Sequence, residues 1–117
     1  MRNAFLAAVA LLMFTPLGFS QAKPRTFIGQ MMDEPCAKNG SHDAGYRMTG
    51  THTPKDCTLA CANSGAKIVL YIAADKTFYL LDNQTKARAF AGENVKVTGT
   101  YNAKTRTIHV EAIAAAP

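Results

Sequence analysis

The chain has 117 residues, with 13 Lys and Arg against 8 Asp and Glu, which gives a formal net charge of +5. This length accommodates one domain and is too short for two domains of ordinary size. The basic residues are scattered from Lys23 to Arg106 instead of gathering in one stretch, so the charge argues against nucleic acid as the partner.

The first segment of the chain is predicted to be a cleavable secretory signal peptide spanning residues 1–22. One arginine supplies the positive start, residues 5–14 are apolar, and small residues at Ser20 and Ala22 offer a cleavage site. The apolar run is far shorter than the roughly 20 residues that a transmembrane helix needs, so we expect no membrane span after cleavage. The mature domain would then be residues 23–117, periplasmic or secreted.

Five segments of the mature domain have the composition and alternation of β-strands. In the fourth, Val95 and Val97 are predicted to point inward. In the fifth, Ile108, Val110 and Ala112 are predicted to do the same. The predicted strands are Thr26–Met32, Ala66–Ala73, Thr77–Leu81, Asn94–Tyr101 and Thr105–Ile113.

Two helices are predicted between these strands. In the long segment of residues 33–65, Thr53 followed by Pro54 has the form of a helix N-cap, so residues 57–64 are expected to be helical. The rest of that segment shows no apolar alternation. After the third strand, an Asp or Asn cap and a following glycine predict a second helix at Asn83–Ala91.

The order strand, long loop, strand, strand, helix, strand, strand is that of the OB-fold, a small five-stranded barrel. We therefore expect an all-β protein with short helices, built as a five-stranded OB-fold-like barrel. A helix would lie between strands 3 and 4, and a long helical loop would join strands 1 and 2. An SH3-like barrel would lack the helix between strands 3 and 4.

The long loop holds all three cysteines and two of the three histidines. In a helix, residues four apart lie on one face, so Cys57 and Cys61 are expected to present their sulfurs together. Three thiolates with one imidazole form a tetrahedral set typical of zinc, and sulfur suits Cu(I) equally well. The loop is therefore predicted to hold zinc or copper. The ligands would be Cys36, Cys57, Cys61 and one histidine, His42 or His52.

The cysteines also fit two other roles. In the oxidising environment outside the cytoplasm, Cys36 would form a disulfide with Cys57 or Cys61, adding stability on the order of 3 kcal/mol and leaving one cysteine unpaired. Alternatively, Cys57 at the start of a helix would act as a redox thiol, although the chain lacks a Cys-x-x-Cys motif. The sequence leaves these three roles open, predicts no other cofactor and indicates no oligomeric state.

Aromatic residues predict a ligand-binding surface on the same face of the barrel as the Cys/His loop. OB-folds bind ligands on strands 2 and 3 and on the loops that join strands 1 and 2 and strands 4 and 5. Tyr71, Tyr79 and Tyr101 would form a ligand-binding face there, on which bases or sugars stack. The alternative is that these rings pack within the barrel.

Two sets of motifs resemble exported bacterial proteins. Residues 91–100, Ala-Gly-Glu-Asn-Val-Lys-Val-Thr-Gly-Thr, resemble the helix-to-strand passage of exported OB-fold domains. A second resemblance, to a group of small secreted bacterial proteins of unknown function, covers nearly the whole mature domain. The motifs that carry it are Phe27-Ile28-Gly29, Asp33 with Cys36, residues 56–61 and residues 64–67. It implies the fold and favours His42 over His52, because in that pattern a His soon follows the first Cys.

These observations predict an exported, non-catalytic binding module that holds a soft metal ion in its Cys/His loop. The first alternative is a barrel stapled by one disulfide, which is purely structural or binds oligosaccharide, peptide or nucleic acid. The second alternative is a thiol redox protein. The expected partner is a metal ion or an unidentified small ligand.

Overall fold

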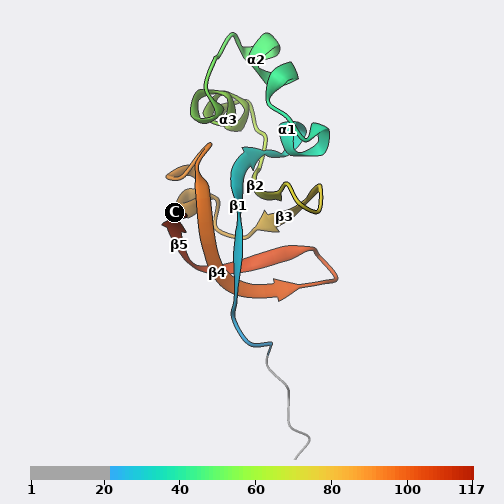
Figure 1. Ribbon diagram of the computed structural model, residues 1–117, viewed down its shortest axis with the longest axis vertical. Coiled ribbons are helices and arrows are strands. Elements are labelled where there is room, and N and C mark those ends of the chain that lie inside the picture. The colour runs from blue at the N-terminus through green and yellow to red at the C-terminus, as the bar shows by residue number, and fades with distance from the viewer. Residues whose placement is uncertain (1–21) are drawn as a thin grey trace, which may run out of the picture.

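The computed structural model describes residues 22–117, so the predicted signal peptide, apart from its last residue, lies outside the described residues. The strands form one sheet that closes into a ring, and three helices lie together at one end of it (Figure 1). In chain order the elements are β1 (Arg25–Asp33), α1 (Glu34–Asn39), α2 (Asp43–Thr49), α3 (Pro54–Asn63), β2 (Ile68–Ile72), β3 (Thr77–Leu81), α4 (Gln84–Arg88), β4 (Asn94–Asn102) and β5 (Thr107–Ala115).

The ring closes because β1 pairs with two different strands along its length. Residues 25–30 lie antiparallel to β4, and residues 30–33 lie antiparallel to β2. Gly29 stands next to this change of partner, where a Cβ atom would lie 2.4 Å from the carbonyl oxygen of Tyr71. A short parallel pairing between β3 and β5 completes the order β1-β2-β3-β5-β4.

The interior of the ring is the main hydrophobic core. Val95, Val97 and Ile108, which the sequence predicted to point inward, are fully buried there. The other buried members of this cluster are Phe27, Met31, Ile68, Leu70, Leu81, Ala87 and Val110. Strand alternation therefore identifies the core-facing side of β4 and of the first half of β5.

The prediction that Ala112 points inward is wrong. Gly99 pairs with Val110, whereas the preceding residue of β4 pairs with Ala112, so β5 carries one extra residue, Glu111, at this point of the ladder. Such a bulge reverses which side chains face the core. Ala112 is therefore exposed, and Ile113 packs against the core in its place.

A second, smaller core lies between the outer face of the ring and the segment α1–α3. β2 is buried on both faces, since Leu70 belongs to the ring interior while Val69 and Tyr71 belong to this outer cluster. The buried residues of the outer cluster are Met32, Cys36, Ala37, Cys57, Val69 and Tyr71. The helical segment thus carries two of its thiols into an apolar interface with the ring.

The sequence predicted one of the three helices in this segment. α3 was expected from its cap, and α4 was expected between β3 and β4, although it is shorter than predicted. α1 and α2 have six and seven residues, which is too short for an apolar periodicity to show. Within residues 22–117, no helix has the length and apolar character needed to span a bilayer.

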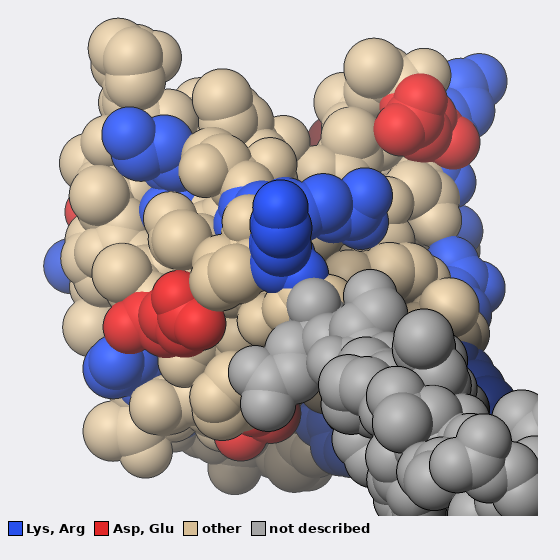
Figure 2. All heavy atoms as spheres, turned by 90° about the horizontal axis from the view of Figure 1, so that it is seen from below, with Lys and Arg blue, Asp and Glu red and all other residues tan. Residues whose placement is uncertain are grey.

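The end of the molecule opposite α1–α3 carries charges of both signs. Some Lys and Arg side chains meet near the centre of this face, and others are spread around it together with acidic side chains (Figure 2). Interspersed charges of this kind are typical of a solvated protein surface.

Candidate metal centre

The first candidate ligand, Asp33, stands where β1 ends and α1 begins. Its Oδ2 accepts a hydrogen bond from the backbone N–H of Cys36 at 3.0 Å, so the carboxylate caps the helix. Pro35 lies in the first turn of α1, where backbone N–H groups have no partner within the helix, so the N–H that proline lacks is not needed. This local geometry holds the Cys36 side chain within one turn of the Asp33 carboxylate.

His42 reaches the same place from the turn between α1 and α2. Gly40 ends α1 with a φ of 70°, a left-handed conformation that glycine adopts without steric cost. The imidazole of His42 stacks on the ring of Tyr46 with 5.6 Å between centroids and 20° between planes. This contact orients the imidazole, which is 8% exposed.

Cys57 comes from the first half of α3. Thr53 Oγ1 accepts a hydrogen bond from the backbone N–H of Asp56 at 3.1 Å, and Pro54 follows the cap, as the sequence predicted. Cys57 is fully buried, and Cys61, one turn later, is half-buried.

These elements bring four potential metal ligands together. One donor atom each from Asp33, Cys36, His42 and Cys57 lies within 4.8 Å of the other three, and all four residues are buried. Asp33 Oδ1 and both ring nitrogens of His42 have no hydrogen-bond partner. Because burying polar atoms without partners is unfavourable, a cation bound between them would satisfy groups that the protein itself leaves unpaired.

Gly45 in α2 shapes the cluster from the outside. A Cβ atom at this position would lie 2.6 Å from Cys57 Sγ and 2.7 Å from Cys36 Sγ. The backbone of α2 therefore lies directly against both sulfurs, and only glycine fits.

The cysteines are free thiols. Although Cys36 Sγ and Cys57 Sγ lie within 4.8 Å of each other, no disulfide joins any of the three cysteines. A disulfide bond requires a sulfur separation of about 2.05 Å. The predicted pairing of Cys36 with Cys57 or Cys61 is thus not formed in the described structure.

The pKa values of Cys36, Cys61 and His42 are shifted by their surroundings. Burial, followed by the neighbouring Asp33 carboxylate, raises the pKa of Cys36 well above its usual range and raises the pKa of Cys61 to about 11. Burial also lowers the pKa of His42, although Asp33 and Asp43 act in the opposite direction. A bound cation would favour the thiolates, so metal binding must release protons from the cysteines.

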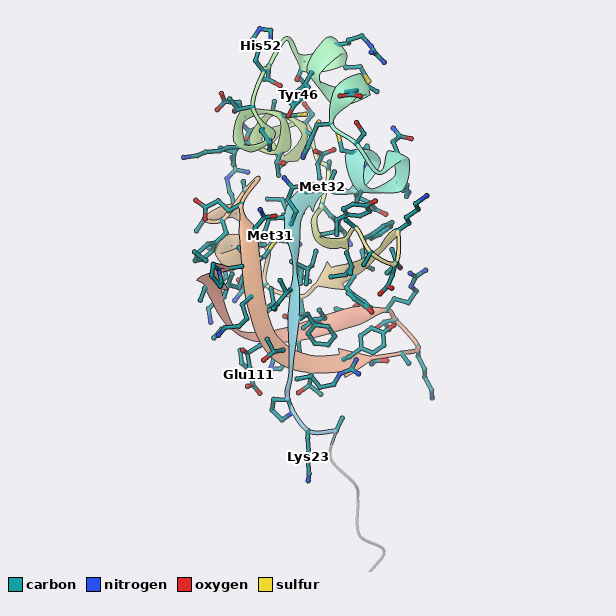
Figure 3. All side chains as sticks on the ribbon, viewed as in Figure 1. Lys23, Met31, Met32, Tyr46, His52 and Glu111 are labelled. Atoms are coloured by element: carbon teal, nitrogen blue, oxygen red, sulfur yellow. The ribbon has the colours of Figure 1, made fainter. Side chains whose placement is uncertain are left out.

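The other predicted ligands lie outside the four-residue cluster. His52 is exposed in the connection between α2 and α3, at the far end of the helical segment (Figure 3). Cys61 is not a member of the cluster, but it is close enough to Asp33 and Cys57 for both to raise its pKa. The structure therefore places His42, and not His52, with Cys36 and Cys57.

Asp33 is the member of the cluster that sequence reasoning missed. A signal for it was present, because Asp33 precedes Pro35 and Cys36 in the pattern of a helix N-cap. The same reasoning that identified α3 would have placed this carboxylate beside Cys36.

The three tyrosines predicted to form one ligand-binding face lie in two places. Tyr79 and Tyr101 meet edge to face at 5.1 Å, and both pack against Phe27 of the ring core. Tyr71 instead belongs to the outer cluster beneath the helices, with its hydroxyl close to Gly40. The arrangement brings Tyr79 and Tyr101 together and separates them from Tyr71.

Comparisons of the chain with known protein families, curated proteins and solved structures found no match. The resemblance to small secreted bacterial proteins therefore stays a prediction. The function is inferred from the geometry of the cluster.

Proposed function

We propose that the protein is an exported, non-catalytic OB-fold-like module that binds a soft metal ion, zinc or copper, in the loop between β1 and β2. The observation that carries this proposal is the cluster of Asp33, Cys36, His42 and Cys57. It comprises four buried donors within 4.8 Å of one another, and three of its polar atoms lack hydrogen-bond partners.

The strand order supports the OB-fold assignment. A ring in the order β1-β2-β3-β5-β4, with α4 between β3 and β4, has the connectivity expected of that fold. OB-folds use the loop between strands 1 and 2 for ligands, and this is the segment that carries the cluster. Fold-level analogy alone does not establish a function, so the donor set carries the greater weight.

The chemistry of the donors supports the choice of metal. Two thiolates, an imidazole and a carboxylate are ligand types that zinc accepts in tetrahedral geometry, while the sulfurs also suit Cu(I). Four protein ligands fill a tetrahedral coordination sphere, as in structural zinc sites, which is why we propose binding and not catalysis. In this role α1, α2 and α3 would each be tied to β1 through the ion.

The test is a metal and thiol count on one preparation of the full chain. Protein purified under reducing conditions without chelator is analysed for zinc and copper by mass spectrometry, and its reactive thiols are titrated before and after chelation. We expect a single metal ion per chain and thiols that react fully only after the metal is removed.

Two histidine variants provide a matched pair. His42→Ala removes a proposed ligand and should weaken zinc binding by more than about a hundredfold, because even partners of ligands contribute tenfold or more. His52→Ala changes an exposed residue of the same segment and should bind zinc as the parent does. Equal affinities in the two variants, or a parent protein without affinity for zinc or Cu(I), would refute the proposed function.

A further inference from the structure

A cavity of about 360 Å³ lies beside the four-residue cluster. Asp33, Cys36 and Cys61 line its inner side, and Ala44 and Met48 of α2 line it elsewhere. Met48 is 86% exposed, so this part of the wall meets solvent. The cavity thus connects the surface of the protein to two members of the cluster and to the third thiol.

The burial of the cluster raises the question of how an ion reaches it. Asp33 and Cys57 are completely inaccessible to solvent, and Cys36 is nearly so. Cys61 is the one thiol that is half-buried; it lines the same cavity as Asp33 and Cys36 and lies one helical turn after Cys57 in α3. Cys61 therefore lines the cavity next to two of the buried donors without belonging to the four-residue set.

We propose that this cavity is the passage through which the metal ion enters and leaves, and that Cys61 is the exchange ligand that transfers the ion between a thiol carrier and Cys57. This inference rests on the proposed function, because it concerns the traffic of the same ion. In this proposal Cys61 acts during the transfer of the metal ion and is not a ligand of the ion once it is bound.

The transfer is a pair of ligand exchanges with no change in the oxidation state of the metal. The carrier is a low-molecular-weight thiol complex of the ion. In the first exchange a bond forms between the metal and Cys61 Sγ, the bond to one carrier sulfur breaks, and the Cys61 proton passes to the departing carrier thiolate. In the second, Cys57 Sγ replaces Cys61 Sγ on the metal, and the proton released by Cys57 returns to Cys61. Asp33, Cys36 and His42 then displace the remaining carrier thiolates, and the proton released by Cys36 leaves on one of them.

The unpartnered Oδ1 of Asp33 supports this route. It is completely buried, belongs to a residue that lines the cavity, and is free to bind a cation that has reached Cys61. A carboxylate at the inner end of the passage would attract the ion as it loses its carrier ligands. The path thus leads from a half-exposed thiol to a buried anionic group, and then to the second thiol.

The test compares rates of metal transfer with affinities. Metal-free full-length protein is mixed with a zinc–glutathione complex in a stopped-flow instrument, and the metal–thiolate absorbance is followed in time. Zinc affinity is measured separately by competition with a chromophoric chelator. Cys61→Ser should slow transfer by about tenfold or more, a change in barrier of about 1.4 kcal/mol, while its zinc affinity stays close to that of the parent.

Two further variants address the passage itself. Ala44→Leu adds bulk to the cavity wall without touching a donor, and it should also slow the transfer. Met48→Leu keeps the apolar wall and removes a thioether that zinc does not require, so it should transfer zinc at the parental rate. Far-ultraviolet circular dichroism of each variant establishes that the fold is intact.

The outcomes separate this inference from the proposed function. If Cys61→Ser and Ala44→Leu both accept zinc at the parental rate, the passage is refuted while the metal site stands. If Cys61→Ser loses affinity in the same proportion as rate, Cys61 is a resting ligand and the exchange role is wrong. If the parent protein does not bind zinc or Cu(I), the proposed function itself fails.

Discussion

Gly45 is a position at which the addition of one methyl group should disturb the cluster. In an exposed helix, replacing glycine by alanine stabilises the helix by up to about 1 kcal/mol. Here the new methyl group would lie closer than 3 Å to two sulfurs, so it must displace Cys36 or Cys57. The Gly45→Ala change is therefore favourable for the helix and unfavourable for the geometry of the cluster.

We predict that Gly45→Ala lowers zinc affinity by about tenfold or more, which corresponds to about 1.4 kcal/mol, as measured by chelator competition. Gly50→Ala is the control, because no atom lies within 4 Å of a Cβ at that position. Its φ of 70° makes alanine strained, so Gly50→Ala should lose about 1–2 kcal/mol of stability and keep its zinc affinity. Unchanged affinity in Gly45→Ala would show that the α2 backbone does not constrain the sulfurs.

Asp82 and His109 form a second polar pair, remote in sequence from the cluster. His109 is an exposed residue of β5, and its Nδ1 is hydrogen-bonded to Asp82 Oδ2. Asp82 Oδ1 also accepts the backbone N–H of Val110 at 2.8 Å. Burial alone would raise the pKa of Asp82. The hydrogen bonds from Val110 and His109 and the charge of His109 lower the pKa by more than burial raises it, so it lies below its usual value of 3.8.

The sign of this shift predicts how stability depends on pH. A carboxylate with a lowered pKa in the folded state contributes stability that is complete above its unfolded-state pKa and lost as the pH falls through the folded-state pKa. Asp82→Asn should therefore be less stable than the parent at neutral pH, and the difference should vanish once the pH has fallen below the folded-state pKa of Asp82. Chemical unfolding across this pH range measures it, with the exposed Asp75→Asn as the control. A difference that persists at low pH would assign the effect to packing.

At the scale of single elements, the N-cap residue of α1, Asp33, both caps the helix and belongs to the cluster. Asp33 caps the helix through Oδ2 and offers Oδ1 to the cluster. Asparagine is an equally good N-cap but is uncharged, whereas alanine is a poor cap. Substitutions at this position can therefore separate the helix from the metal site.

We predict that Asp33→Asn binds zinc about tenfold or more weakly, because a neutral amide replaces a buried anionic ligand. The metal-free form of this variant should be more stable than the parent, since an unpaired buried carboxylate is removed while the cap remains. Asp33→Ala should also lose zinc affinity, and it should be about 1 kcal/mol less stable than Asp33→Asn because the cap is missing. Denaturant unfolding with and without zinc gives all three values. A metal-free Asp33→Asn protein less stable than the parent would contradict this account of the carboxylate.

The element scale also explains what the sequence failed to predict. The caps of α1 and α3 have similar form, but only α3 is long enough for the pattern to be extended into a helix, so α1 and α2 were missed. The inward face of β5 was predicted correctly up to Val110 and wrongly at Ala112, because a bulge is a property of the pairing of two strands. Local signals predicted the elements, and the errors arose where tertiary pairing overrides them.

At the scale of the whole molecule, the order of elements was predictable while the assembly of the cluster was not. Cys36, His42 and Cys57 were predicted to be ligands from their residue types, but their meeting point depends on how α1, α2 and α3 fold back on the ring. The turn at Gly40, which has a φ of 70°, sets part of this path. In the sequence, the glycine at the turn is the only signal of this tertiary geometry.

The arrangement of the whole molecule predicts that metal binding stabilises its two parts unequally. The ring has its own core of buried aliphatic residues, whereas the segment α1–α3 is held by the smaller outer cluster in which two of the six buried residues are cysteines. A ligand that binds only the folded state contributes about 2.7 kcal/mol when its free concentration is about 100 times its Kd. For a domain of this size that corresponds to a Tm shift of up to roughly 10–20 °C, and less if the unfolded thiols also bind metal.

We predict that chelation lowers the Tm of the parent protein and increases amide hydrogen exchange mainly in α1, α2 and α3, while the strands of the ring keep their protection. The reason is that removing the ion leaves Asp33 and His42 with unpaired buried atoms that only the helical segment can expose by opening. Cys57→Ser should show the increased exchange without chelator, and His52→Ala should behave as the parent does. Uniform loss of protection across ring and helices would mean that the two cores unfold as one unit, with the ion acting on the whole fold.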